Sequence, residues 1–137
     1  MLKRCFAIFY LIIFMSFSGA LFAEKRPVLY GYADSFEIYL ENGSFGNNIV
    51  FTDAKGFAAL KRVKGESCIV TVNYDQVLKD LGAVAVFSEK TAYGESFYAF
   101  SAKIPYKAEL NGKTVNIHYF VSENYNKLGT PLIFGGY

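Results

Sequence analysis

Few side chains in this chain could carry out chemistry, and the two most reactive are Cys68 and His118. A thiolate next to a histidine is a strong nucleophile, so these two side chains could form a catalytic pair if the fold brought them together across a sheet. Cys68 lies among Ile69, Val70 and Val72, where we expect a small buried thiol without the electropositive surroundings that activate cysteine. An enzyme using Cys68 or His118 is therefore kept only as an alternative.

A metal, cofactor or second catalytic arrangement is not indicated by the sequence. His118 is the only histidine, and it shares with Asn116 and Phe120 what we expect to be the exposed polar face of a strand. Neither facing carboxylates for glycoside hydrolysis nor the glycine spacing of a phosphate-binding loop is evident. We predict no catalytic residue, no metal and no cofactor, hence a non-enzymatic protein.

The first 23 residues have the pattern of an export signal. Lys3 and Arg4 form a basic head, and an apolar run from Cys5 to Phe17 follows. A run of about 7–15 apolar residues that ends in small residues is typical of a cleaved signal peptide. We predict cleavage after Ala23, a single domain over residues 24–137, and a secreted or extracytoplasmic location in the cell envelope.

An uncleaved leader is the alternative, because residues 2–23 approach the roughly 20 residues that a membrane-spanning helix needs. The domain would then be a membrane-tethered accessory subunit, and this segment would be its only contact with the membrane. Removal of the leader also removes Cys5, so Cys68 would have no intramolecular disulfide partner.

The charge balance argues against nucleic acid as a partner. The chain has 14 Lys and Arg and 12 Asp and Glu, and the two basic residues of the leader account for the difference. The remaining domain is formally neutral and lacks the basic surface that a polyanion requires.

Alternation of apolar and polar residues, the strand period, dominates the domain. We expect strands around 35–41 and 48–52, joined by an Asn42-Gly43 turn. Residues 57–63 and 68–72 are predicted to be the arms of a hairpin with its turn at 64–66. Further strands are expected near 84–86, 95–102 and, after Pro131, at 132–134.

Two local sequence signals are stronger than this alternation. Asn73 followed by Gln76 resembles a capping box, and Gly82 ends a predicted helix of about two turns. Asn111-Gly112 is a strong two-residue hairpin signal, and it pairs Ala108 with Val115. The predicted fold class is therefore α+β: an antiparallel sheet with one short helix packed on one face.

Aromatic residues are abundant, and one short helix cannot cover a wide sheet; the aromatic side chains either fill a small core or leave part of their number exposed. Some of them are predicted to form an exposed patch, because a large apolar surface area usually marks an interaction site. The candidate surface consists of Tyr93, Tyr98, Phe100, Phe120 and Tyr125. Another envelope protein or a cell-wall component is the expected partner, bound by this surface or by an open edge strand.

Segments near the carboxyl end also resemble a known family. They are residues 97–101, 104–106, 111–118 and 129–137, which lie within the last third of the chain. These segments resemble the YwmB-like group of small exported proteins of Gram-positive bacteria. The resemblance implies a TATA-binding-protein-like fold without an established activity, and it assigns no functional residue.

Overall fold

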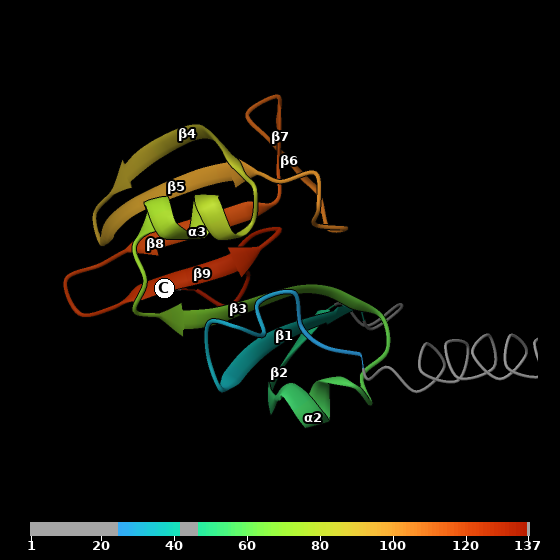
Figure 1. Ribbon diagram of the computed structural model, residues 1–137. Helices are drawn as coiled ribbons and strands as arrows, with labels where there is room; N and C mark the ends of the chain where they lie inside the picture. The colour runs from blue at the N-terminus through green and yellow to red at the C-terminus, as the bar shows by residue number, and fades with distance from the viewer. Residues whose placement is uncertain (1–24, 42–46, 137) are drawn as a thin grey trace, which may run out of the picture.

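The computed structural model describes residues 25–41 and 47–136, and its main feature is one antiparallel sheet (Figure 1). Seven strands are hydrogen-bonded in the order β2-β1-β3-β9-β8-β5-β4. Their bounds are β1 Ser35–Glu41, β2 Asn47–Asp53, β3 Val63–Val70, β4 Val84–Thr91, β5 Gly94–Phe100, β8 Ile117–Val121 and β9 Asn126–Thr130. A separate hairpin and two short helices complete the described elements: β6 Ala108–Leu110, β7 Lys113–Val115, α2 Ala54–Phe57 and α3 Tyr74–Asp80. The predicted sheet-dominated fold is confirmed in this outline.

The predicted leader over residues 1–23 and the Asn42-Gly43 turn lie outside the described residues. Within the ranges that the structure describes, no helix is long and apolar enough to cross a membrane. Cleavage after Ala23 and the alternative anchor over residues 2–23 both stay predictions.

The sheet has two differently covered faces. Residues directly opposite each other on antiparallel strands share a face. On one face, called here the helix face, buried side chains of five strands form the core under α2 and α3. They are Phe36, Ile38, Cys68, Val70, Ala99, Ile117, Tyr119 and Leu128. The opposite face is called the tail face, because residues 131–136 (the C-terminal tail) lie against it.

Helix α3 follows its sequence signals. The Asn73 side chain accepts a hydrogen bond of 2.9 Å from the Gln76 N–H, which satisfies one of the free amides of the first turn. Gly82 has a φ of +58°, the left-handed conformation that ends many helices. Val77 is fully buried, and Tyr74 packs its ring against Phe97 and Tyr119 of the helix face. These contacts hold α3 over β5 and β8 (Figure 1).

The predicted hairpin over residues 57–72 is wrong. Residues 54–57 form α2 instead, capped by Asp53, whose carboxylate accepts a hydrogen bond from the Gly56 N–H. The predicted turn at 64–66 belongs to the single strand β3. Strand β3 pairs with β1 on one side and with β9 on the other, so it joins the two ends of the chain within one sheet.

The Asn111-Gly112 turn is confirmed, with Ala108 opposite Val115 as predicted. The hairpin ends with that pair, because the chain leaves it after Val115 to enter the main sheet as β8. Asn116 occupies the corner and is fully buried; its amide group bonds the backbone N–H and C=O of Ser101. Asn116 is therefore not on an exposed polar face, and that prediction is wrong.

The last strand is also placed differently from the prediction. Strand β9 ends at Thr130, before Pro131, and the predicted strand at 132–134 is instead part of the C-terminal tail. The tail turns back over the sheet, where its backbone and side chains contact strands from both halves of the chain.

Candidate interaction face

Cys68 and His118 lie on opposite faces of the sheet. Cys68 is paired with Leu128, which is paired in turn with Tyr119, and these side chains belong to the helix face. His118 is paired with Gly129 and belongs to the tail face. The two side chains are therefore not brought together, although a catalytic Cys68–His118 pair would require this. Burial raises the pKa of the Cys68 thiol to about 12, so the thiol is protonated near neutral pH.

His118 is buried, contrary to the predicted exposed position. Its Nδ1 atom accepts a hydrogen bond of 3.2 Å from the Ile133 N–H, and its Nε2 atom lies 2.9 Å from the Ser96 Oγ. The ring stacks on Tyr98, with 4.5 Å between centroids. Burial lowers the pKa of His118 from 6.5 to about 4, which keeps the imidazole neutral near pH 7.

Two glycines of the tail face allow the C-terminal tail to approach the strands closely. A Cβ on Gly129 would lie 2.7 Å from the Ile133 Cγ1, and a Cβ on Gly65 would lie 2.8 Å from the Phe134 ring. Both distances are shorter than nonbonded carbon contacts allow. Phe134 then stacks on Tyr39 of β1, with 4.1 Å between ring centroids.

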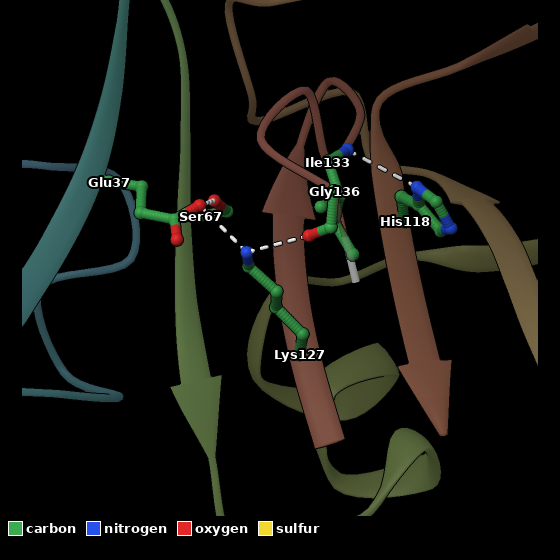
Figure 2. A network of polar contacts seen from close by, with 6 residues as sticks. All are labelled: Glu37, Ser67, His118, Lys127, Ile133 and Gly136. Carbon is green, nitrogen blue, oxygen red and sulfur yellow. Dashed lines mark hydrogen bonds and ion pairs between the residues drawn. The ribbon is translucent and has the colours of Figure 1, made fainter. Parts of the chain in front are cut away.

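An ion pair beside the tail links β1 to β9 (Figure 2). Lys127 Nζ donates to Glu37 Oε2 at 2.7 Å and to the carbonyl oxygen of Gly136 at 2.9 Å. The Ser67 hydroxyl of β3 donates to the same Glu37 oxygen at 3.0 Å. Figure 2 shows these groups converging from three adjacent strands and the tail. The Lys127 side chain is almost fully buried, and these partners replace the hydrogen bonds to water that it has lost.

A hollow of about 260 Å³ lies next to this ion pair. Glu37, Ser67 and Lys127 line it, and Phe51 of β2 and Ile69 of β3 stand at its sides. Phe51 is 74% exposed and Ile69 is 61% exposed, both large values for apolar side chains. Exposed apolar walls around a polar floor are suited to binding a protein segment with mixed side chains.

Two further exposed apolar side chains continue this surface along the tail. Ile49 is opposite Tyr39 in the β1–β2 pairing, and Phe134 stacks on that tyrosine. Ile49 and Phe134 also line a small hollow with Gly135. We call the surface formed by Ile49, Phe51, Ile69 and Phe134, with the ion pair between them, the β2–β3 patch.

The predicted aromatic surface is only partly exposed. Tyr98 is 4% exposed, since it is stacked between Phe87 and His118, and Phe120 is 0% exposed. Both are therefore unsuited to an exposed patch. Phe100 is half-buried, with the Lys107 ammonium over its ring.

The remaining two residues of that set do come together. Tyr93, which is 79% exposed, and Tyr125 line an open hollow of about 890 Å³, with Phe120 at its base. This hollow lies where the β4–β5 turn meets the β8–β9 connection. Only one large apolar side chain of this hollow, Tyr93, is strongly exposed, whereas Phe51 and Ile69 are both strongly exposed in the β2–β3 patch.

The sequence of β2 contains a signal for the β2–β3 patch beyond its strand pattern. In β2, Ile49 and Phe51 alternate with Asn48, Val50 and Thr52, so each of the two faces of the strand carries at least one apolar residue. A strand that is apolar on both faces is either buried on both or exposes one of them. Which of these applies depends on the strand order, which the alternation does not determine.

Among the described residues, no group of three or more histidine, cysteine or acidic side chains could hold a metal ion. Comparison of the chain with protein-family models, with curated proteins and with solved structures finds no match. The resemblance to the YwmB-like group therefore stays a prediction, and function is argued from the geometry.

Proposed function

We propose that this chain is a small exported protein without catalytic activity, which binds another protein through the β2–β3 patch. The strong exposure of Phe51 and Ile69 on one face is the observation that carries the proposal. Scattered apolar side chains are ordinary on a surface, but neighbouring ones around a hollow favour a binding site. The two residues line the same hollow.

The ion pair supports this function by giving the hollow a fixed floor. Lys127 and Glu37 neutralise each other, and the tail carbonyl and the Ser67 hydroxyl complete their hydrogen bonds. A partner would therefore meet a preorganised surface with little uncompensated charge, which lowers the entropy lost on binding.

Site-specific photo-crosslinking in the cell tests the proposed surface. A photoreactive residue at position 51 should capture a defined partner, and the matched position is 93, an equally exposed aromatic at the other end of the sheet. An Ile69→Asp substitution should reduce the capture at position 51, because it places a charge beside the contact. Equal capture at positions 51 and 93, or none at 51, would refute the β2–β3 patch.

Export rests on the leader and is tested separately. Sequencing the amino terminus of the protein recovered from the cell envelope should give Glu24 as the first residue. A retained leader would instead favour the membrane-tethered accessory subunit.

A further inference from the structure

The two edges of the sheet differ in how they are protected against pairing with another strand. Strand β4 carries Glu89 and Lys90, and its register with β5 shifts between Ala85 and Phe87. Charges and bulges of this kind keep an edge from accepting a further strand. Strand β2, at the other edge, pairs with β1 over its whole length without a register shift.

The composition of β2 leaves that edge open. Its sequence contains neither Lys, Arg nor Pro, and its only charge is the terminal Asp53. In the part of the chain that the structure describes, β2 pairs with β1 alone. The edge therefore offers unpaired backbone groups beside two exposed apolar side chains, Ile49 and Phe51.

We propose that a second copy of this chain occupies the edge, with β2 pairing antiparallel to β2 of its partner about Val50. This inference rests on the proposed function, since the seam includes Ile49 and Phe51 of the β2–β3 patch. Val50 then lies opposite Val50 of the partner subunit, Ile49 opposite the partner's Phe51, and Asn48 opposite the partner's Thr52. Each apolar side chain meets an apolar one, and each polar side chain meets a polar one.

The faces of the sheet agree with this register. Ile49 and Phe51 lie on the tail face and Val50 on the helix face, as their partners on β1 show. Opposed residues of an antiparallel pair share a face, so the seam would bring both copies' Ile49 and Phe51 into one cluster. A register displaced by one residue would set Val50 against the partner's Phe51. Successive residues of a strand direct their N–H and C=O groups to opposite sides, so only one of these two residues would point its backbone groups at the seam, and the hydrogen bonds would not match.

The pairing is expected to be reversible. A seam of one strand from each copy, with six apolar side chains in all, is expected to bury less than the roughly 1,200 Å² that stable complexes bury. The dimer should therefore form as protein concentration rises, and it should join two seven-stranded sheets into one continuous sheet.

Disulfide trapping tests the register. In a background with Cys5 and Cys68 replaced by alanine, Val50→Cys should give a covalent dimer on mild oxidation, because opposed Cα atoms lie about 4.5–5.5 Å apart. The matched control is Thr52→Cys on the same strand and face. Its symmetry mate lies four residues away, about 13 Å at strand spacing, so it should not cross-link.

Mixing two variants sharpens this test. Asn48→Cys and Thr52→Cys chains should cross-link to each other and not to themselves. Absence of the Val50→Cys dimer, or equal cross-linking by Thr52→Cys alone, would overturn the proposed pairing.

Sedimentation equilibrium tests the association itself with the protein as purified from the cell. The unmodified chain should show a reversible monomer–dimer equilibrium, and Phe51→Asp should weaken it about tenfold or more. Tyr93→Asp, at the opposite end of the sheet, should leave it unchanged. A monomer at all concentrations, or no effect of Phe51→Asp, would overturn self-pairing. Capture of a different protein at position 51 would then still support the proposed function.

Discussion

The imidazole of His118 fastens the C-terminal tail to the sheet, since its Nδ1 atom accepts the hydrogen bond of the Ile133 N–H at 3.2 Å. A nitrogen that accepts must be unprotonated, so the proton of the neutral ring lies on Nε2 and points to Ser96. A doubly protonated ring could only donate, and the contact with Ile133 would be lost. The histidine thus couples the tail to the protonation state of one buried group.

Stability is expected to fall on acidification because of this histidine. The unfolded chain takes up a proton near pH 6.5, whereas burial lowers the pKa of His118 in the folded chain to about 4. Between these values protons favour the unfolded state, which removes about 3 kcal/mol of unfolding free energy by pH 4. Urea denaturation between pH 7.5 and pH 4 at intervals of about half a unit would measure the slope.

A His118→Asn variant is the control for that slope. Its side-chain oxygen can accept from Ile133, but it does not titrate, so the fall between pH 6.5 and 4 should be smaller than in the unmodified chain. Glu66 acts in the opposite direction, because burial raises the pKa of its carboxyl group. Comparing the two chains cancels the Glu66 contribution, and identical slopes would contradict the role of His118.

Lys127→Met should destabilise the fold by about 1–3 kcal/mol. The substitution leaves the Glu37 carboxylate without its cation and the Gly136 carbonyl without its donor. The matched control is Lys64→Met, whose ion pair with Glu41 is about half exposed and should be worth under about 1 kcal/mol. Urea denaturation would compare the free energies of unfolding of the two variants. Equal losses would show that the buried ion pair stabilises the fold no more than the exposed one.

Gly129→Ala should displace the C-terminal tail. The added methyl group would lie 2.7 Å from Ile133 Cγ1 and 2.9 Å from the Leu132 carbonyl oxygen, so the tail has to move. Hydrogen exchange at the Ile133 amide should accelerate at least about tenfold, as expected when a local contact worth over 1 kcal/mol is lost. Gly31→Ala, which has no atom within 4 Å of the new methyl group, should leave that exchange rate unchanged.

Glu66→Ala should release the segment before β1. The carboxylate accepts hydrogen bonds from the Val28 and Leu29 amides at 2.9 and 3.0 Å, and the Tyr106 hydroxyl is 3.4 Å away. Unpaired buried amides cost about 1–3 kcal/mol each, so the fold should weaken and both amides should exchange faster. Tyr106→Phe removes only the longest contact and should have a smaller effect; an equal effect would contradict this ranking.

Elements determined by neighbouring residues could be predicted from the sequence. The Asn73 cap and the Gly82 end of α3 depend on a few adjacent residues, and both are where the pattern places them. The Asn111-Gly112 turn is similar, since both residues take the positive φ angles that such a turn requires.

Features that depend on distant segments could not be predicted in this way. His118 and Asn116 follow an alternation typical of an exposed face, yet the tail and the Ser101 corner cover them. Gly65 resembles a turn residue, but its place is required by the approach of Phe134, about 70 residues further along. The β2–β3 patch depends likewise on the position of β2 at the edge, a consequence of strand order.

The position of β3 has a consequence for how the molecule can assemble. Strands β2, β1 and β3 can pair as soon as residues 35–70 are available. The other side of β3 stays unpaired until residues 126–130 of β9 are available. Contacts between residues so far apart in sequence are slow to form. A polypeptide that is synthesised amino end first therefore cannot form the β3–β9 pairing, in the middle of the sheet, before residues 126–130 are available. Until then the part of the sheet formed by β2, β1 and β3 lacks its neighbour β9.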